Sequence, residues 1–583
     1  MTTVLDAPGA PADLFVMSGR PPDCGRDDRA GRGRPSPRPV EARAVVGLTL
    51  VVYLTIAMLL DFHYLILPGD AMSRTANGFY VLFSRDPHLG AIGFVWTPLT
   101  SVVDLFFLLF KGVWPALLTH DVAGSLTSVL AMTGAVHQLR ALLAEWNVSR
   151  GPRLALTAMF AFNPMILYYS ANGMSEAIYV FTLVAATRYL VTWLNSGRTR
   201  ALVFSAAMLA LAFLGRNEAV AAAATGGVLV FAVSYRSAGA RTGRSRIRTA
   251  FSDMVVFLLP FSVTFVGWAV TGYVLTGKLL AQFQANALQV SIAGVARSSS
   301  SARLLHEFTA LFYIAPLLPV VLILAGFTAI RRRDVQPLGV ISLLGGSLAF
   351  SLLSYFDAKI FPWFRFYILA VPIEILLCGY LVAKLLGPTA EPWRFSVPGW
   401  LRRPAIGTLV GMGIAVALIG PSIPTTAEAM LNPVVSPETT QDLGFVFHAH
   451  PSAADRQSQE HYAHIVAISS YIAGLHLPEG DILLDDSDSC APEIIITSAS
   501  PRVFVIPNDR DFQRVLADPL TFHDRYLLLP QPSGLNAYDA VSQQFPGVYD
   551  GQSRIARVDH TFKSGGLCPA YRLLRVIGHP SSA

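Results

Sequence analysis

The feature that most constrains this chain is a recurring run of apolar residues long enough to cross a lipid bilayer. A spanning helix needs about 20 such residues, and the sequence holds eleven runs of roughly this length. They lie at 42–60, 121–143, 153–171, 174–194, 200–215, 218–235, 252–275, 307–330, 337–355, 366–386 and 405–421. Of the 583 residues, 53% are hydrophobic and only 14% charged, against about 25% charged in soluble proteins. The sequence therefore predicts a polytopic α-helical membrane protein with about eleven transmembrane helices.

The basic residues of the short loops predict the orientation of these helices. With the N-terminus inside, one side of the membrane receives every strongly basic loop, as the positive-inside rule requires. These loops carry Arg140, Arg150 and Arg153; Arg198 and Arg200; Arg236, Arg241, Arg244, Arg246 and Arg248; Arg331–Arg333; and Arg394, Arg402 and Arg403. Counting the apolar run Leu99–Leu118 as a span would reverse this pattern, so we expect it to be re-entrant or interfacial. The net charge of +6 thus orients a membrane protein and does not indicate a nucleic-acid partner.

The two ends of the chain differ from the middle in composition. Residues 1–40 are rich in Pro, Gly, Arg and Asp and predict a disordered cytoplasmic tail without a cleaved signal peptide. Residues 41–421 form the predicted transmembrane domain, with an outer loop at 61–99. Residues 422–583 predict an extracytoplasmic α/β domain, with a helix at 453–475 and strands at 481–484, 502–506, 525–529 and 571–576. Cys490 and Cys568, the two cysteines of this region, are expected to pair, because disulfides persist outside the cell.

The outer loop contains a carboxylate in a helical setting. Gly69–Asp70 is a natural helix start, and an acid in the first turn is favoured by the helix dipole. At helical spacing Asp70, Arg74 and Asn77 share one face, while Met72, Ala76, Phe79 and Phe83 form an apolar face that we expect to lie on the membrane. Asp70 would then be a general base for an acceptor hydroxyl. The alternative is a helix-start acid in an i,i+4 pair with Arg74.

Four segments carry a resemblance to a known superfamily. They are Asp70 followed by a helix and Trp96-Thr-Pro-Leu99; Asn163-Pro-Met-Ile-Leu-Tyr-Tyr-Ser-Ala-Asn-Gly-Met-Ser-Glu176; Leu214-Gly-Arg-Asn-Glu218; and Arg365-Phe-Tyr-Ile-Leu-Ala-Val-Pro372. The chain resembles GT-C glycosyltransferases, such as protein O-mannosyltransferases, lipid A aminoarabinose transferases and the mannosyltransferases of GPI-anchor assembly. The resemblance implies that Asp70 lies beside the acceptor hydroxyl and the anomeric carbon of the donor. It departs from the usual Asp-Glu pattern, since Ala71 follows Asp70.

Charged residues at the outer ends of other predicted spans are candidate substrate ligands. Glu176 and Glu218 open two spans, where acids are costly and usually face a cavity or a partner. We expect Glu176, Arg216, Glu218 and Arg74 to bind substrate; the alternatives are a helix-start charge for Glu176 and an Arg216–Glu218 pair. His88, in the turn Arg85-Asp-Pro-His88, is a further candidate that would reach a polar site.

The leaving phosphate of the donor needs a cation, because its charge grows as the glycosidic bond breaks. The short aromatic loop Tyr355–Tyr367 offers Arg365 as the phosphate ligand and Lys359 as its helper. The alternative is that both side chains extend to the membrane interface among aromatic residues.

Together these features predict a membrane glycosyltransferase. It would transfer a mannose- or pentose-like sugar from a polyprenyl phosphate to a hydroxyl of a lipid, glycan or protein acceptor outside the plasma membrane, by inversion. We identify no cofactor and no obvious metal motif, and no Walker A or GxGxxG sequence. A Gly-, Ala- and Arg-rich composition indicates a bacterial source. The alternatives are a secondary transporter or lipid flippase, which would place charges mid-span, and a non-catalytic membrane assembly protein.

Overall fold

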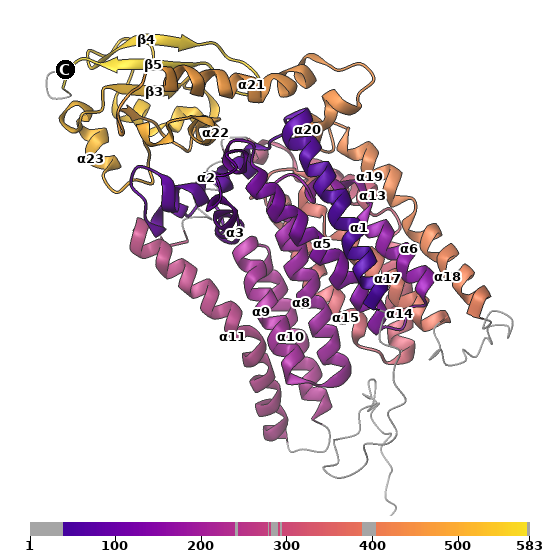
Figure 1. The fold of residues 1–583 in the computed structure, drawn as a ribbon. Coiled ribbons are helices and arrows are strands. Elements are labelled where there is room, and N and C mark those ends of the chain that lie inside the picture. The colour runs from indigo at the N-terminus through magenta and orange to yellow at the C-terminus, as the bar shows by residue number, and fades with distance from the viewer. Residues whose placement is uncertain are drawn as a thin grey trace, which may run out of the picture.

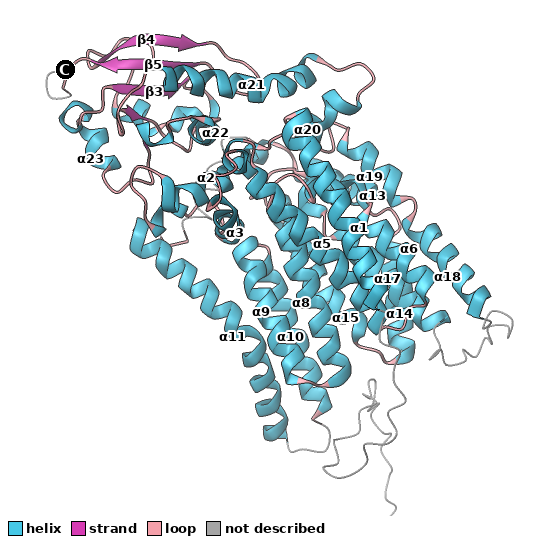
Figure 2. Ribbon diagram, viewed as in Figure 1, coloured by secondary structure: helices cyan, strands magenta, loops and turns pink. Residues whose placement is uncertain are grey.

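The computed structural model describes residues 39–238, 243–277, 279–280, 290–291, 294–386 and 404–579. Figure 1 shows a bundle of long helices with a smaller domain at one end, and the strands are confined to that smaller domain (Figure 2). We call the bundle, residues 39–447, the membrane domain, and residues 448–579 the outer domain, a name that refers only to its place at one end of the bundle. Of the predicted N-terminal tail, residues 1–38 lie outside the described residues.

The membrane domain is built from helices, most of them long and aligned with the bundle, with a few short helices among them (Figure 1). They are α1 (Pro39–Met58), α5 (Val122–Glu145), α6 (Arg150–Ala161), α7 (Pro164–Tyr169), α8 (Glu176–Ser196), α9 (Thr199–Gly215), α10 (Ala219–Ser237), α11 (Gly243–Thr276), α13 (Ser300–Ile314), α14 (Leu318–Arg332), α15 (Gln336–Val340), α16 (Gly346–Phe356), α17 (Ala370–Leu386) and α18 (Pro404–Ile419). Among the described residues, seven helical segments are long and apolar enough to cross a membrane, or eight if the bent pair α13–α14 counts as one span.

These seven segments coincide with seven of the predicted spans, which makes the chain a multi-pass membrane protein. They are Val40–Tyr64, Glu176–Ser196, Ala219–Ser237, Gly243–Thr276, Gln336–Phe356, Phe364–Leu386 and Ala405–Met430. The predicted spans at 121–143, 153–171 and 200–215 are also helical, as α5, α6 with α7, and α9. They are too short or too polar to count as spans by themselves, so the predicted number of eleven is not confirmed.

The predicted span at 307–330 is helical but broken into α13 and α14, which count as one span only as a bent pair. The chain bends by 76° between α13 and α14. Pro316 lies in the break and Pro319 in the first turn of α14, and proline lacks the N–H that continues a helix. The run Leu99–Leu118 forms α3 (Leu99–Leu108) and α4 (Ala116–Thr119). At about 1.5 Å per residue, neither helix is long enough to cross a bilayer.

Burial separates central from peripheral helices. α17 and α8 are buried over most of their length, whereas α1 and α11 leave most of their apolar surface exposed, as helices that face lipid do. At the bundle end opposite the outer domain, α1 is fixed by the buried carboxylate of Glu41. Arg140 Nη1 lies 3.0 Å and Arg153 Nη2 2.8 Å from its Oε1. These pairs satisfy a charge that would otherwise be costly to bury.

The outer domain contains a five-stranded sheet in the order β2-β1-β3-β5-β4. The strands are β1 (Ile482–Leu483), β2 (Phe504–Val505), β3 (Tyr526–Pro530), β4 (Ala556–Phe562) and β5 (Tyr571–Val576), and the helices are α21 (Ala453–Gly474), α22 (Ala491–Thr497), α23 (Phe512–Ala517) and α24 (Ala540–Gln544). β1 pairs in parallel with both β2 and β3, and β5 pairs antiparallel with both β3 and β4. Four strands lie where the sequence analysis expects them. The fifth, β4, is an edge strand with mostly exposed residues, and its weak apolar pattern escaped prediction.

The boundary between the domains lies later in the chain than residue 422. α19 (Ser422–Met430) and α20 (Pro437–Phe447) follow α18, and their residues Met430, Val435 and Leu443 belong to the core of the membrane domain. The outer domain's own core starts with α21. Within this domain Cys490 and Cys568 form a disulfide across a sequence separation of 78 residues.

The outer loop contributes α2 (Gly69–Phe83), which lies between the two domains (Figure 1). Its residues Met72, Ala76 and Phe79 are almost completely buried and share one core with Ile494 and Ile495 of the outer domain. The expectation that this apolar face lies on the membrane is therefore wrong. The stripe is buried against protein because the outer domain presents its own apolar surface to it.

Three ion pairs join the end of this loop to the outer domain. Arg85 Nη2 lies 3.0 Å from Asp509 Oδ2, and Arg85 Nη1 donates to Asp511 Oδ2 at 3.1 Å. Asp86 in turn accepts from the backbone N–H of Arg510 at 2.9 Å and from its guanidinium. We call these five residues the interdomain clamp.

The clamp predicts that Arg85→Ala loosens the outer domain. The Asp509 side chain is 1% exposed and would lose its cation, at a cost of about 1–3 kcal/mol in the free energy of unfolding. We expect faster amide exchange at 504–512 and a lower unfolding temperature in detergent. Arg502→Ala is the matched control, because Arg502 pairs with Glu479 at the exposed surface. Equal behaviour of the two variants would show that the clamp does not hold the domains together.

Candidate active site

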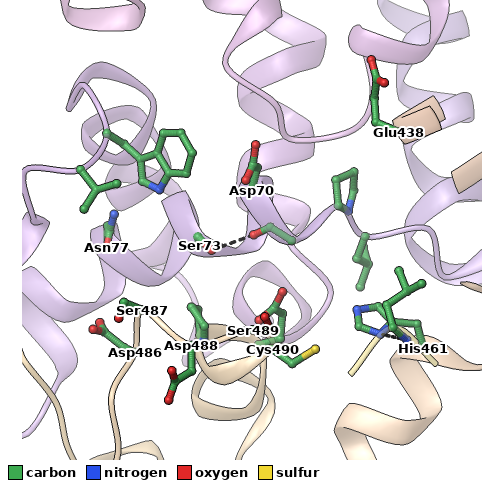
Figure 3. A pocket seen from close by; sticks show the side chains of 18 of the residues that line it. Asp70, Ser73, Asn77, Glu438, His461, Asp486, Ser487, Asp488, Ser489 and Cys490 are labelled. Carbon is green, nitrogen blue, oxygen red and sulfur yellow. Dashed lines mark hydrogen bonds between the residues drawn. The ribbon is translucent and has the colours of Figure 1, made fainter. Parts of the chain in front are cut away.

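Asp70 occupies the first turn of α2. Pro68 precedes the helix in an extended conformation and Gly69 is its first residue, so the helix starts directly after the turn that leaves the membrane domain. Ser73 Oγ donates to the Gly69 carbonyl at 2.8 Å. Asp70 therefore stands at the end of α2 that faces the space between the domains (Figure 3).

The carboxylate of Asp70 begins a chain of alternating charges. Arg365 Nη2 lies 2.7 Å from Asp70 Oδ2, and Arg365 Nε lies 3.4 Å from Glu176 Oε1. The same Glu176 oxygen pairs with Arg216 Nη1, whose Nη2 lies 2.7 Å from Glu218 Oε1. The five residues come from α2, α8, the turn between α9 and α10, and the 3₁₀ turn η5 (Phe364–Tyr367) before α17. Segments far apart in the sequence thus meet at the outer end of the bundle.

Arg74 joins this group through the backbone of Asp70 and an aromatic ring. Its Nη1 donates to the main-chain carbonyl of Asp70 at 2.7 Å, and its guanidinium lies 4.5 Å from the ring centroid of Trp96. The i,i+4 relation to Asp70 is therefore present, but the hydrogen bond goes to the carbonyl and not to the carboxylate. Arg365 lies in the same way over Trp363, at 4.0 Å.

These cations set the ionisation of Asp70. Burial alone raises the pKa of its carboxyl group, but attraction by Arg365 and Arg74, and more weakly by Arg216, outweighs burial and holds the pKa below its ordinary value. Asp70 is therefore a carboxylate at neutral pH. Its Oδ2 faces Arg365, and no described residue donates a hydrogen bond to its Oδ1.

Two predicted site residues form no ion pair with this group among the described residues, although Lys359 lines the second cavity described below. His88 lies beside Asp86 of the clamp, with Nε2 3.9 Å from Asp86 Oδ2, and is not among the described residues that line either cavity below. Lys359 is 70% exposed in its side chain and lies 3.0 Å from Asp357. The other candidates, Asp70, Arg74, Glu176, Arg216, Glu218 and Arg365, are brought together.

Two cavities open beside the charge chain. The first, of about 480 Å³, lies between α2, α20 and the outer-domain loop 486–493. In Figure 3 Asp70, Ser73 and Asn77 of α2 face this loop across the cavity. The second, of about 270 Å³, is lined by Arg74, Arg216 and Lys359 together with Glu218. Val95 and Trp96 line both cavities.

The two cavities differ in charge. Among the described residues that line the first, six carry carboxyl groups and one a guanidinium: Asp70, Glu438, Asp442, Asp486, Asp488, Glu493 and Arg365. The charged residues around the second are three cations and one acid. An anionic group therefore fits the second cavity better than the first.

The sequence analysis missed the acids of the first cavity other than Asp70. Glu438 and Asp442 lie on α20; burial raises the pKa of Glu438 to about 7 and that of Asp442 to about 6. Tyr168 Oη donates to Asp442 Oδ2 at 2.6 Å. Asp486-Ser-Asp488 directly follows a parallel strand, where ligand sites of open sheets gather. This Asp-x-Asp sequence after a predicted strand was the signal by which the acids of this loop could have been found.

The region holds one set of residues with metal-ligand spacing among the described residues. His461, Cys490 and Cys568 bring ligand atoms within 4.8 Å of one another. The two cysteine sulfurs are joined in the disulfide, so neither is a thiolate, the form that binds metal. Cys490 and His461 line the first cavity, and the disulfide links this side of the cavity to Cys568.

Buried acids hold α2 against the membrane domain. Thr75 of α2 donates to Asp121, Thr127 donates to Asp104 at 2.6 Å, and Ser125 donates to Asp61 at 2.9 Å. Asp61, Asp104 and Asp121 are each at most 1% exposed. Only the first of these bonds reaches α2, because Thr75 belongs to that helix, while the other two join α5 to α3 and to the turn after α1. The bond from Thr75 to the buried Asp121 helps to fix the position of α2, and with it that of Asp70.

No protein-family model matches the sequence, and no curated protein matches it. Among solved structures the chain is similar to ArnT from Cupriavidus metallidurans bound to undecaprenyl phosphate, with a TM-score of 0.50 and 13% identity over 93% of this chain and 99% of that chain. ArnT in the apo state gives a TM-score of 0.46 and 12% identity over 91% and 98%. The oligosaccharyltransferase AglB from Archaeoglobus fulgidus, in complex with an inhibitory peptide and a dolichol-phosphate, gives 0.42 and 10% over 87% and 70%.

The match to undecaprenyl-phosphate-bound ArnT extends over almost the whole of both chains. The protein therefore has the GT-C fold that its outer-loop and span motifs resemble.

The ion pair predicts a pH signature for Asp70. Because the folded-state pKa of Asp70 lies below its ordinary value, its contribution to stability is complete above about pH 4 and is lost as the pH falls through the folded-state pKa. We expect the difference in unfolding temperature between wild type and Asp70→Asn to stay constant from about pH 7 to about pH 4 and to shrink below that. Tryptophan fluorescence in detergent measures it.

Asp559→Asn, on the exposed side of β4, is the control and should track wild type. A difference between wild type and Asp70→Asn that disappears already between about pH 7 and pH 5 would mean that the cations do not control Asp70.

Proposed function

We propose that the protein is a glycosyltransferase that uses a polyprenyl-phosphate sugar as donor. The observation that carries the proposal is the meeting of Asp70 and Arg365 at 2.7 Å where two cavities of opposite charge adjoin. A carboxylate beside a cationic cavity suits a reaction in which a hydroxyl loses a proton while a phosphate gains charge. The likeness in fold to ArnT bound to undecaprenyl phosphate supports this choice of donor.

In the proposed reaction the acceptor occupies the first cavity and the donor phosphate the second. Asp70 takes the proton of the acceptor hydroxyl, whose oxygen forms a bond with the anomeric carbon. The bond between that carbon and the phosphate oxygen breaks, and its electron pair leaves with the polyprenyl phosphate. Displacement in one step inverts the anomeric carbon. In this proposal the active site faces the outside of the plasma membrane of a bacterium, and the N-terminus lies in the cytoplasm.

The cations divide the work around the leaving phosphate. Arg74, Arg216 and Lys359 line the second cavity and offer donors to phosphate oxygens. Arg365 lines the first cavity and not the second, and it holds Asp70 in place. Its Nη1 meets only the weak acceptor sulfur of Met174 at 3.9 Å, so in this proposal it binds the donor phosphate where that group extends past Trp96 towards Asp70. Glu176 and Glu218 hold Arg365 and Arg216 in position, and in this proposal they act through those arginines.

The transferred sugar would be mannose- or pentose-like, and the acceptor a lipid, a glycan or a protein. Transport of a lipid-linked sugar is the alternative. Transport predicts charged residues within the spans. Glu374 lies inside the span Phe364–Leu386 and is 1% exposed, but the chain of charges on which the transferase proposal rests lies at the ends of α8, α9 and α10.

Replacement of the base tests the reaction. Asp70→Asn keeps the size of the side chain but cannot take a proton, so we expect transfer from polyprenyl-phosphate mannose or polyprenyl-phosphate pentose to fall by at least about 100-fold. Radiolabelled donor in detergent with an extract of membrane acceptors provides the assay. Asp559→Asn is the matched control. Full transfer by Asp70→Asn would contradict the proposed mechanism. Movement of the donor across the membrane by wild type, without transfer of its sugar, would favour the alternative of transport.

Lys359 tests the position of the donor. Its exposed pair with Asp357 is weak, so the ammonium is available to the phosphate. Lys359→Ala should raise KM for the donor about two- to fivefold and leave KM for the acceptor unchanged. Lys563→Ala, at an exposed position of the outer domain, should change neither. A rise in acceptor KM alone would place the donor elsewhere.

A further inference from the structure

The carboxyl group of Glu493 lies against the first residue of α2. Glu493 belongs to α22 of the outer domain, and a Cβ atom added to Gly69 would lie 2.8 Å from its Oε1. Real Cβ atoms do not approach that closely, so glycine is required for the carboxyl group to reach this place. Gly69 immediately precedes Asp70, and Glu493 and Asp70 line the same cavity.

Glu493 is buried without a complete set of partners. The residue is 5% exposed, and its Oε2 is solvent-inaccessible with no hydrogen-bond donor among the described residues. A buried carboxyl oxygen without a donor is costly. Burial first, and then the negative charge of Asp70, raise the pKa of Glu493 to about 7. Within a cavity, such a group is satisfied most simply by a ligand that brings its own donor.

The shape and lining of the cavity indicate the kind of donor. A volume of about 480 Å³ is in the range of small-molecule sites and holds one or two sugar rings. The rings of Trp96 and Trp363 line it and offer apolar faces. An acceptor with a phosphate or a carboxylate would have to lie beside the ionised Asp70 and five further acids, and its charge would be opposed wherever these acids are ionised. Hydroxyl groups, which donate to carboxylates, match the wall without a charge conflict.

We propose that Glu493 is an acceptor-binding residue, and that the acceptor is an uncharged glycan with hydroxyl groups on neighbouring carbons. One hydroxyl is bound by Asp70 and attacks the donor, and the next donates a hydrogen bond to Glu493. This inference rests on the proposed transferase function and adds to it the class of acceptor. It also gives the outer domain a direct part in the site, because Glu493 is carried by that domain.

The first experiment compares two acceptors with the same labelled donor. Methyl α-mannoside has neighbouring hydroxyl groups, whereas 1-butanol has only the attacking one. Glu493→Gln should raise KM for methyl α-mannoside about tenfold or more and leave transfer to 1-butanol unchanged. Glu479→Gln, which lies at the exposed surface of the same domain, is the matched control. Equal losses with both acceptors, or no loss with either, would overturn the role of Glu493.

A second variant moves the carboxyl group without removing it. Gly69→Ala introduces a Cβ against the flexible end of the Glu493 side chain, so the carboxyl group shifts while the helix is retained. We expect the same loss for methyl α-mannoside as in Glu493→Gln. Gly474→Ala, at a helix position with no atom within 4 Å of the added Cβ, is its control. Wild-type kinetics in Gly69→Ala would contradict the proposal.

Direct binding separates this inference from the transferase proposal. Saturation-transfer NMR with methyl α-mannoside requires no donor and no turnover. If wild type binds the sugar and Glu493→Gln does not, the acceptor site stands even if no donor supports transfer, and only the reaction would have to be revised. If wild type binds no methyl α-mannoside, or binds methyl α-glucuronide equally well, the uncharged-glycan assignment fails whatever the transfer assay gives.

Discussion

The ion pair between Asp70 and Arg365 is the interaction on which the site depends. The two residues are 295 positions apart in sequence, and each is a charge that the membrane-proximal interior tolerates only with a partner. Their contact at 2.7 Å therefore fixes α2 over the start of α17. Glu176, Arg216 and Glu218 extend the alternation, so that four separate segments are held together by neutralisation of charge.

α2 is the structural element through which the two domains meet. On one side, Thr75 is hydrogen-bonded to Asp121, next to the membrane domain. On the other, Met72, Ala76 and Phe79 are packed into the core of the outer domain. Because α2 is fixed from both sides, Asp70 has one position relative to the acids of the outer domain. The first cavity is consequently a property of the assembled domains, and neither would form it alone.

The contrast between the cavities follows from which segments line them. The second is surrounded by loop ends of the membrane domain, which contribute Arg74, Arg216 and Lys359. The first takes its acids from α20 and from the loop after β1. Trp96 stands at the junction and lies under the guanidinium of Arg74. A reaction between an anionic donor and an uncharged acceptor would use this division, because the cations attract the donor phosphate and the acid-rich cavity disfavours it.

The sequence alone determined the local features of this protein. Apolar runs of about 20 residues specify membrane helices because nothing else satisfies the backbone in lipid, and short apolar runs such as Tyr526–Pro530 specify buried strands. Charges at the ends of apolar runs also marked Asp70, Glu176 and Arg365 as candidates. Pro316 lies in the break between α13 and α14. Proline at this place is a local sign of a broken helix, although the sequence pattern predicted one span.

Only the tertiary structure decided which of these charges meet. His88 and Lys359 looked equivalent to the other candidates in sequence, yet one lies at the clamp and the other is largely exposed. Glu493 carried no signal, because its role depends on the absence of a side chain at Gly69, more than 400 positions away. Sequence patterns report the period and polarity of one segment. Contacts between distant segments depend on how whole helices and domains pack, and that information is in no single stretch of the chain.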